Sequence, residues 1–413
     1  MLDINFVKEN KDLVKKGTEE KGCDSAIVDR VLKVDGVRRD LIGKIEELRA
    51  EKNKLNQYDI EKGRKIKKEL RKIEPDLKAV EEELKNLLFD IPNPPAADVH
   101  FGKDESENIE VKKWGKPTKF SFKAKSYQEL GELLDIIDTK TASKVSGSRF
   151  GYLKNEGVLL ELALINFVME ALLKEKFIPI IPPTMISMES MKGLGYMEKG
   201  GEQNMYLLEK DNLVLVATAE HSLVPMHKNE ILNGDKLPLR YVGFSSSFRR
   251  EAGSYGKDTQ GIFRVHQFDK VEMVSFIKPQ ENDDQKENEY LLSLEEKIVQ
   301  ALGIPYQVTK MCSGDLGHPA ARKYDINSWF PSEGRYRETH SVSTCTDYQA
   351  RRLSIRYKDK NGNGFVHILN GTAVAIGRMI LTILENYQQK DGSVEIPKVL
   401  QRYTGFKKIS PKR

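Results

Sequence analysis

Hydrophobic residues in the first quarter of the chain follow a heptad pattern. Two runs alternate steps of three and four residues, the first with lapses at Arg38 and Lys52 and the second with none. The first run is Ile27, Val31, Val34, Leu41, Ile45, Leu48 and Leu55, and the second is Ile66, Leu70, Ile73, Leu77, Val80, Leu84 and Leu87. This spacing is typical of helices that pair along an apolar seam. The pattern therefore predicts two long helices.

A short polar break separates the two predicted helices. It reads NQYDIEKG and offers Gly63 as a turn residue. We therefore expect an antiparallel helical hairpin over residues 27–88. The second helix, residues 64–88, would be roughly 37 Å long at about 1.5 Å per residue. Pro75 lies inside this helix and is a candidate kink.

A proline-rich stretch, IPNPPAADVHFGKDESEN, begins at Ile91 and predicts a domain boundary. Beyond it, short strand-like runs alternate irregularly with two helical runs, at residues 155–176 and 288–303. The segment KDKNGNG between RLSIRY and FVHILN predicts a hairpin turn. Clustered hairpins beside helices favour an α+β fold with an antiparallel sheet over a doubly wound sheet. The expected divisions are an N-terminal helical arm (1–95), a linker (96–117) and a body (118–413).

Composition places the chain among soluble proteins. The 413 residues carry a net charge of +5, which permits a nucleic-acid partner without requiring one. Cys23, Cys312 and Cys345 lie far apart and form no CxxC pair, so we expect neither a disulfide framework nor a zinc site. No secretion signal opens the chain, and no apolar run reaches the roughly 18 residues of a membrane span. We expect a cytoplasmic protein with no membrane partner.

The tip of the predicted hairpin is basic. Its cations are Lys52, Lys54, Lys62, Arg64, Lys65, Lys67, Lys68, Arg71 and Lys72, and the nearby acids are Asp59, Glu61 and Glu69. One interpretation is a solvated coiled-coil surface. The other is an arm that follows the phosphate backbone of a nucleic acid. The segment viewed alone leaves both open.

Several common catalytic signatures are absent from the sequence. GSYGKD, from Gly253, has neither the spacing nor the hydroxyl residue of a phosphate-binding P-loop. No GxGxxG follows a strand, and there is no GxSxG, HExxH or kinase motif set. The histidines His221, His227, His318 and His340 do not have a metal-ligand spacing, so each is interpreted as an ordinary polar contact.

Polar residues instead recur on five strand-like segments of the body. They are Thr218 and Glu220; Arg249 and Glu251; Arg264, Phe268 and Glu272; Glu338 and Ser341; and Asn370, Thr372 and Arg378. Alternate residues of a strand share a face, so Arg249 would point with Glu251, and Phe268 with Lys270 and Glu272. A single Arg-x-Glu is usually a salt bridge on an exposed sheet. Five such segments favour a binding site.

These residue types suit a nucleotide. Arginine donates two parallel hydrogen bonds to phosphate. A phenylalanine ring offers a stacking face for a base, worth roughly 1–3 kcal/mol. Glutamates near phosphates can hold Mg²⁺.

The segments resemble the class II aminoacyl-tRNA synthetases, and in particular the seryl-tRNA synthetase family. FRREAGSYGKDTQGIFRVHQFDKVE (248–272) resembles the second class motif, and LNGTAVAIGRMILTILENYQ (369–388) resembles the third. FVMEALLKEKFIPIIPP (167–183) resembles the first, the dimer segment of the family. TAE, VSGSRF and YRETHSVSTCTDYQARR resemble segments particular to the seryl members. The resemblance covers essentially the whole chain.

The resemblance implies an ATP-dependent reaction in which serine becomes a seryl-adenylate and is then transferred to the 3′ end of tRNA(Ser), and of tRNA(Sec) where that tRNA occurs. It implies that Arg249, Arg264, Glu338 and Arg378 are catalytic. It places ATP on Arg249, Arg250, Glu251, Val265, Phe268, Glu338, Thr339, His340, Ser341 and Arg378.

The resemblance also implies the amino-acid and metal sites. Serine would lie on Thr218, Ala219, Glu220, Arg264, Glu272, Asn370 and Thr372, and Mg²⁺ on Glu338 and Ser341. A pocket that hydrogen-bonds a hydroxyl rejects the analogue lacking it by about 10⁴–10⁵, so alanine would need no editing domain.

The same resemblance implies that the helical arm binds tRNA and that the chain forms a homodimer. The arm residues are Lys54, Lys62, Arg64, Lys65, Lys67, Lys68, Arg71 and Lys72. The dimer would form through the helix, strand and proline near 160–183.

Three rival interpretations remain at this point. A relative could load its adenylate onto a carrier protein, but such a protein would lack a true tRNA arm. A non-enzymatic RNA-binding protein would have lost Arg249, Glu251, Glu338 or Arg378, and all are present. The third alternative is a class II synthetase for another amino acid, and only an exchange assay across amino acids would distinguish it from a seryl enzyme.

Overall fold

The structure is a computed structural model that describes residues 1–56, 58–252, 261–279 and 283–412. It divides into two compact units, Met1–Pro94 and Pro95–Arg413. No helix in the described part of the chain is long and apolar enough to cross a membrane.

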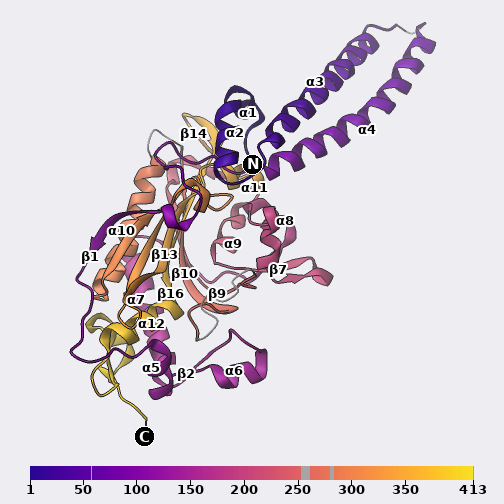
Figure 1. The fold of residues 1–413 in the computed structure, drawn as a ribbon. Helices are drawn as coiled ribbons and strands as arrows, with labels where there is room; N and C mark the ends of the chain where they lie inside the picture. Colours follow the sequence, from indigo (N-terminus) through magenta and orange to yellow (C-terminus); the bar gives the residue numbers. More distant parts are fainter. Residues whose placement is uncertain (57, 253–260, 280–282, 413) are drawn as a thin grey trace. The chain divides into compact units, whose positions relative to one another are not determined.

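The N-terminal unit is helical and contains the predicted hairpin. Figure 1 shows its two long helices running side by side. The helices are α1 (Ile4–Glu9), α2 (Lys11–Glu20), α3 (Ala26–Asn53) and α4 (Ile60–Asp90). The prediction of two long helices is confirmed, but Gly63 is not a turn residue. Helix α4 already begins at Ile60, because the Gly63 N–H donates to the Asp59 carbonyl oxygen at 2.9 Å. Helix α4 also continues through Pro75.

The heptad residues form the seam between α3 and α4. Ile45, Ile66 and Leu70 are buried there, packed with Leu48, Leu55, Ile73 and Leu77. The lapse at Arg38 has a physical reason. Arg38 donates to Asp35, which is fully buried and also binds Lys8 at 2.5 Å and Arg39 at 3.1 Å. Burial alone would raise the pKa of Asp35, but Lys8 and Arg38 outweigh it and lower the pKa.

The second unit is built on an eight-stranded sheet, which confirms the α+β prediction. All neighbouring strands are antiparallel except β4, which runs parallel to β9 at one edge. In spatial order the strands are β1 (Ile109–Trp114), β11 (Tyr306–Lys310), β12 (Arg322–Phe330), β13 (Arg335–Thr344), β16 (His367–Ala375), β10 (Gln267–Ile277), β9 (Leu239–Phe248) and β4 (Ile178–Ile180). Strand β1 falls inside the segment 96–117 expected to be a linker.

Helices cover one face of this sheet and make the main core. Helix α7 (Glu156–Lys174) packs on β9, β10 and β16, α10 (Asp283–Ala301) on β13 and β16, and α12 (Ile376–Tyr387) on β10 and β12. Both α7 and α10 were predicted from their apolar runs. On the other face, a second apolar cluster that includes Val274 and Phe276 covers one end of β10, and the remainder of the central strands carries polar side chains.

Smaller elements surround the sheet. The remaining helices are α5 (Tyr127–Leu133), α6 (Thr139–Ser146), α8 (Met188–Leu194), α9 (Glu220–Leu223), α11 (Tyr348–Leu353) and α13 (Gln401–Thr404). The remaining strands are β2 (Ile137–Asp138), β3 (Tyr152–Leu153), β5 (Met185–Ser187), β6 (Leu207–Leu208), β7 (Leu213–Leu215), β8 (Ile231–Asn233), β14 (Arg356–Asp359), β15 (Gly362–Phe365), β17 (Val394–Glu395) and β18 (Lys408–Ile409).

The hairpin predicted at KDKNGNG is confirmed. Strands β14 and β15 pair antiparallel, with Asp359 opposite Gly362, so Lys360 and Asn361 form the turn. The strand predicted from RLSIRY is only half right. Its first residues end helix α11, Ser354 takes a left-handed conformation at φ 55°, and the strand begins at Arg356.

The buried charge of Asp35 generates a stability prediction. Asp35→Asn keeps the side-chain shape but removes the charge that Lys8, Arg38 and Arg39 share. We expect the opening free energy of α3 to fall by about 2 kcal/mol, so that its amides exchange about 30-fold faster. Hydrogen exchange of α3 peptides in the full chain measures this. Asp76→Asn, an exposed site on α4, is the control. Equal exchange in both variants would contradict the prediction.

Candidate active site

Polar side chains gather on the sheet face opposite the covering helices. Residues paired directly across antiparallel strands share a face. Ser343 pairs with Asn370, and Thr372 pairs with Glu272. Along β10, Phe268 and Lys270 lie on the same side as Glu272, as the strand periodicity predicts.

A β-bulge allows Glu338 and Ser341 to face the same way. Three residues apart, they would point to opposite faces of a regular strand. In β13, however, His340 pairs with Ile326 and Glu338 with Asn327, so Thr339 is an extra residue without a partner position. Both Thr339 and His340 are buried, at 1% exposure. Glu338 and Ser341 therefore both line the cavity.

A second bulge lies in β16, next to β13. Val271 pairs with Val374 and Glu272 with Thr372, which leaves Ala373 as the extra residue. Ala373 and Val374 are both fully buried in the core. Thr372 and Ala375 consequently line the cavity despite their spacing of three.

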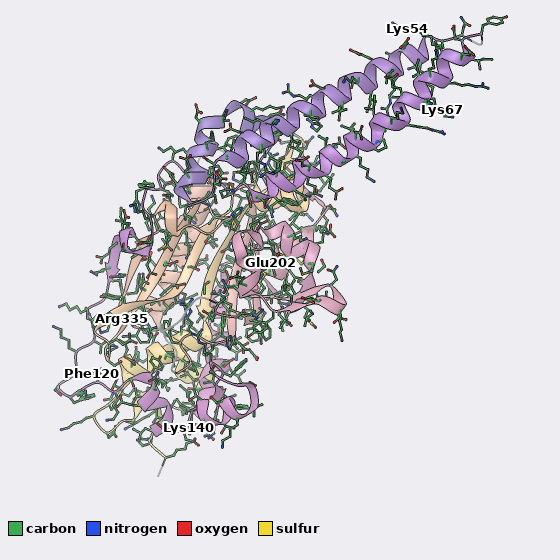
Figure 2. The ribbon with its side chains drawn as sticks, turned by 45° about the vertical axis from the view of Figure 1, so that its right-hand side comes forward. Lys54, Lys67, Phe120, Lys140, Glu202 and Arg335 are labelled. Atoms are coloured by element: carbon green, nitrogen blue, oxygen red, sulfur yellow. The ribbon has the colours of Figure 1, made fainter. Side chains whose placement is uncertain are left out.

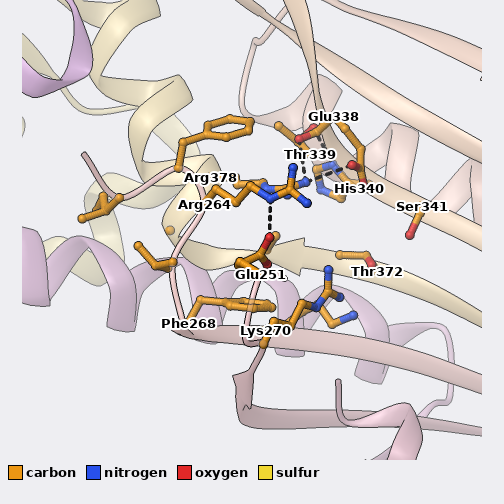
Figure 3. Close-up of a pocket in the computed structure, with 16 residues that line it drawn as sticks. Glu251, Arg264, Phe268, Lys270, Glu338, Thr339, His340, Ser341, Thr372 and Arg378 are labelled. Carbon is orange, nitrogen blue, oxygen red and sulfur yellow. Dashed lines mark hydrogen bonds and ion pairs between the residues drawn. The ribbon is translucent and has the colours of Figure 1, made fainter. Parts of the chain in front are cut away.

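Two adjoining cavities lie over this face. The first has a volume of about 60 Å³. It is lined by Arg249, Glu251, Ile262, Phe263, Arg264, Val265, Phe268, Lys270, Glu338, Thr339, His340, Ser341, Thr372, Ala375, Gly377 and Arg378. Figure 3 shows Phe268 on one side and Arg378 on the other, with Glu251 between them. The cavity is narrow because its own charged side chains occupy it.

Ion pairs and ring contacts hold these side chains. Arg264 donates to the Glu251 carboxylate (Figure 3). Arg378 Nη1 lies 3.2 Å from Glu338 Oε2. The Arg378 guanidinium lies over Phe263, 4.9 Å from the ring centroid, and that of Arg249 over Phe268 at 5.2 Å. Each cation thus has an internal partner that an anionic ligand could replace.

Arg249 and Glu251 reach the cavity by a different route from the one expected. Strand β9 ends at Phe248, so the argument that they share a strand face is wrong. Glu251 has a left-handed backbone at φ 52°. The backbone N–H of Arg249 donates to the His266 carbonyl oxygen at 2.9 Å, which fixes the position of this residue. The irregular backbone turns both side chains into the cavity.

The second cavity has a volume of about 470 Å³ and contains the other polar residues. Thr218, Glu220, Glu272, Asn370 and Arg264 line it, together with Lys270, Lys323, Ser343 and Tyr196. Lys270 Nζ lies 2.6 Å from Glu272 Oε2, and both residues are buried, at 6% and 2% exposure. The Thr372 hydroxyl donates to the same carboxylate at 3.3 Å.

Burial and neighbouring charges set the protonation states of the site. Burial raises the pKa of Glu220 to about 7. It lowers the pKa of His221 and of His340 to about 3, so both rings are neutral at pH 7. Burial alone would raise the pKa of Glu338. Three cations outweigh it and lower this pKa to about 2: Arg378, Lys323 and Arg249. Glu338 is therefore an anion between cations at neutral pH.

A carboxylate and a hydroxyl on one face suit a hard cation such as Mg²⁺. Glu338 is ionised, and the Thr339 bulge directs Ser341 to the same side. No group of three His, Cys, Asp or Glu side chains placed to hold a metal occurs among the described residues. Bound phosphates would have to complete the shell of such an ion.

The structure brings most of the predicted site residues together, but not all. Arg250 is exposed and lines neither cavity. Ala219 is fully buried and packs toward Gly243. The side chains of Thr339 and His340 are directed into the core, although both residues border the first cavity. Residues 253–260, the middle of the second motif, lie outside the described residues.

Other site residues were not assigned from the sequence. They include Lys270, Lys323, Phe263, Tyr196 and Gln349. The strand period placed Lys270 on the correct face but gave it no role. The others come from segments without a strand pattern or from strand β12, so only the fold reveals them.

The eight predicted arm residues are all exposed on α4 or at the end of α3. Figure 2 shows Lys54 and Lys67 on this hairpin. Lys62 pairs with Glu51 at 2.8 Å. These residues form a basic surface on the N-terminal unit.

Comparisons with known proteins agree with this arrangement. A model of the seryl-tRNA synthetase N-terminal domain matches residues 1–95, and a model of the class II tRNA synthetase core domain (G, H, P, S and T) matches residues 206–387. The chain is 45% identical to the serine–tRNA ligase of Dictyoglomus thermophilum, over 100% of each chain. It is 43% identical to that of Pyrococcus abyssi, over 100% of this chain and 98% of the relative.

Solved structures agree as well. A seryl-tRNA synthetase from Pyrococcus horikoshii complexed with ATP matches with a TM-score of 0.95 and 40% identity, over 100% of both chains. A cytoplasmic serine–tRNA ligase from Naegleria fowleri in complex with AMP matches with a TM-score of 0.92 and 32% identity, over 100% of this chain and 99% of that one.

The buried pair Lys270–Glu272 generates a second stability prediction. Lys270→Met would leave Glu272 buried without its counter-charge and should lower the free energy of unfolding by about 3 kcal/mol. The double variant Lys270→Met with Glu272→Leu should recover most of this loss, because an apolar pair replaces the ionic one. Denaturant unfolding measures both. Lys140→Met, which removes the exposed pair with Glu132, is the control and should leave the free energy of unfolding unchanged within the error of the measurement. A double variant no more stable than the single one would contradict the prediction.

Proposed function

We infer that this chain, which belongs to the seryl-tRNA synthetase family, is a serine–tRNA ligase that joins L-serine to the 3′ end of tRNA(Ser) with ATP, through a seryl-adenylate. One observation carries the inference at the site. A narrow cavity lined by arginines and a phenylalanine, which suits a nucleotide, adjoins a larger cavity lined by carboxylates, hydroxyls and an amide. The two share Arg249, Glu251, Arg264, Lys270 and Ser341, so their ligands would meet at these residues.

The first cavity is proposed to bind ATP. Arg249 would hold the α-phosphate, where negative charge accumulates in the transition state. Phe268 and Arg378 lie on opposite sides of the cavity and would cover the two faces of adenine, with Arg378 also reaching the γ-phosphate (Figure 3). Glu251 would accept from the adenine amino group, and the Val265 backbone would contact the base. Phosphate would replace Glu338 as the partner of Arg378.

The second cavity is proposed to bind serine. Its acids Glu220 and Glu272 would attract the ammonium group, and Thr218 would add a hydroxyl. Asn370 and Thr372 would close on the side-chain hydroxyl. Arg264, which lines both cavities, would exchange Glu251 for the serine carboxylate and present it to ATP.

The chemistry then requires position and charge rather than a protein nucleophile. A serine carboxylate oxygen attacks the α-phosphorus, the bond to the bridging oxygen breaks, and pyrophosphate leaves. Arg249 stabilises the charge on the five-coordinate phosphorus. In the second step the terminal ribose hydroxyl of the tRNA attacks the serine carbonyl carbon, its proton is lost, and AMP leaves with the electrons of the broken anhydride bond.

Glu338 and Ser341 are proposed to hold Mg²⁺, because an ionised carboxylate and a hydroxyl share one face there. When bound, the ion would neutralise phosphate charge.

The arm of residues 1–95 is proposed to bind tRNA(Ser), and residues 118–413 to form the catalytic body. The segment 96–117 connects them in sequence and also supplies strand β1 to the sheet of the second unit. The exposed lysines and arginines of the arm would follow the RNA backbone by shape and charge. The same surface would accept tRNA(Sec) where it occurs. No disulfide joins Cys23, Cys312 and Cys345 in the described part of the chain, as suits the cytoplasmic enzyme that we propose.

A homodimer is proposed to form through residues 160–183. Apolar side chains are exposed on and beside this segment: Leu159 at 45%, Leu162 at 50%, Ile178 at 44% and Ile181 at 82%. Grouped exposed apolar residues of this kind mark protein interfaces.

Amino-acid-dependent ATP–pyrophosphate exchange across a panel of amino acids tests the proposed function. Serine should support exchange, while alanine and threonine should not. Exchange with another amino acid in place of serine would contradict the assignment.

The variant Glu272→Gln tests whether the second cavity binds serine and the first binds ATP. We expect the variant to lose at least about 100-fold in kcat/KM for serine, because it removes the charge facing the ammonium group and unpairs Lys270. Its KM for ATP should change by less than about threefold. Pyrophosphate exchange at varied serine and varied ATP measures both. Unchanged serine kinetics would show that Glu272 does not contact serine.

Neutralising the arm separates adenylate formation from tRNA charging. The fourfold variant Lys65→Gln, Lys67→Gln, Lys68→Gln and Arg71→Gln should keep serine-dependent exchange and raise the KM for tRNA at least tenfold. It should also reduce the salt dependence of tRNA binding, by about one unit of log–log slope for each phosphate that the variant no longer neutralises. The control replaces four exposed lysines of the other unit, Lys116, Lys119, Lys123 and Lys407, by Gln. An equal change in the KM for tRNA in the two variants would show that the arm does not recognise tRNA.

A further inference from the structure

The segment YQARR forms helix α11, Tyr348–Leu353, and has no part in the mechanism above. One of its side chains nevertheless contacts an acid of the serine pocket. Gln349 is fully buried, and its Nε2 donates to Glu220 Oε1 at 2.9 Å and to the Leu194 carbonyl oxygen at 3.2 Å. Gln349 lines neither cavity. It therefore acts on the site only through Glu220.

Tyr196 provides a second donor to the same carboxylate. Its hydroxyl lies 3.1 Å from both Glu220 Oε1 and Oε2. Glu220 itself is 97% buried, and helix α9, to which it belongs, begins at this residue. With Gln349 on one side and Tyr196 on the other, the carboxylate plane has little freedom to rotate.

A third side chain secures this arrangement. Arg352, one helical turn after Gln349 on α11, donates through Nη2 to the Lys192 carbonyl oxygen at 2.6 Å and also pairs with Glu198. Its Nη1 donates to the Tyr348 hydroxyl at 3.1 Å. Helix α11 is thus tied to residues 192–198, the segment that carries Tyr196.

We propose that Gln349 is a positioning residue for serine recognition: it holds Glu220 in the orientation and the charged form that receive the serine ammonium group. The proposal rests on the proposed function. It gives the YQARR segment a role that the contacts of Gln349 support directly, because an amide that only donates to Glu220 favours the carboxylate over the carboxylic acid.

The charged groups around Glu220 make its protonation state sensitive to the hydrogen bond from Gln349. Burial and the neighbouring Glu272 raise the pKa of Glu220, while Gln349, Tyr196 and Lys270 act to lower it, with the result near 7. Arg249 also lines the cavity, and Cys345 lies near Tyr196. Because the balance falls close to neutral pH, removing one donor shifts Glu220 toward its protonated, non-binding form.

The test compares Gln349→Met with the wild type and with Arg351→Gln. Methionine has nearly the volume of glutamine but donates no hydrogen bond. Arg351 lies on the same helix, pairs with Asp347 at 2.6 Å and contacts Phe365, away from Glu220. Serine-dependent pyrophosphate exchange is measured from pH 6 to 8.5 at varied serine and at varied ATP, with melting temperatures as a check on folding. Tyr196→Phe removes the other donor and provides a second, independent variant.

In the wild type, serine affinity should rise with pH as Glu220 ionises near pH 7. In Gln349→Met, the KM for serine at pH 7 should rise about tenfold or more, and the pH at which affinity rises should move upward. Tyr196→Phe should move it in the same direction. The KM for ATP, and both constants of Arg351→Gln, should stay within about twofold of the wild type.

Two results would overturn the proposal. One is an unchanged serine KM in both Gln349→Met and Tyr196→Phe. The other is a serine KM raised equally at every pH, which indicates a structural role alone. Absence of serine-dependent exchange in the wild type would instead refute the proposed function. This outcome differs from the two results above, in which the wild type is active.

Discussion

Two extra residues, Thr339 in β13 and Ala373 in β16, set the geometry on which the site depends. A strand that must fill a core on one face and carry reactive groups on the other is limited by strict alternation. The bulges relax that limit in two neighbouring strands at once. Each bulge places two consecutive residues in the core. The next residue along the strand then points again to the face that carries the cavities. Glu338 with Ser341, and Thr372 with Ala375, owe their common orientation to this device.

The second organising principle is the pairing of charge. Arg264 with Glu251, Arg378 with Glu338 and Lys270 with Glu272 are internal pairs within the two cavities. A site that must hold a polyanion and a zwitterion needs charges of both signs, and unpaired charges would be costly to bury. Internal pairing keeps them satisfied in the absence of substrates. With the substrates bound as proposed, each would replace one partner, and the donors would already be fixed near the developing charge, which is the basis of electrostatic preorganisation.

Much of this architecture is readable from the sequence. The heptads predict α3 and α4, and the apolar runs predict α7, α10 and the long central strands. Sequence patterns fail where a single residue departs from regular geometry. Neither bulge has a periodicity signal, and the left-handed turn at Glu251 breaks the strand rule that placed it. The buried contacts of Asp35 and Gln349 could not be predicted either, because their partners, such as Lys8 and Glu220, lie far away in the sequence.

The central claim is that the two cavities together make a seryl-adenylate, and the bound product can be observed directly. The full chain is incubated with serine, ATP and Mg²⁺ without tRNA, separated from free ligands, quenched in acid and analysed by mass spectrometry. The account predicts close to one seryl-adenylate per active site, no covalent adduct on the protein, and loss of the adenylate when a tRNA(Ser) transcript is added, with serine recovered as an ester on the RNA. Absence of the adenylate, or serine bound covalently to the protein, would contradict it.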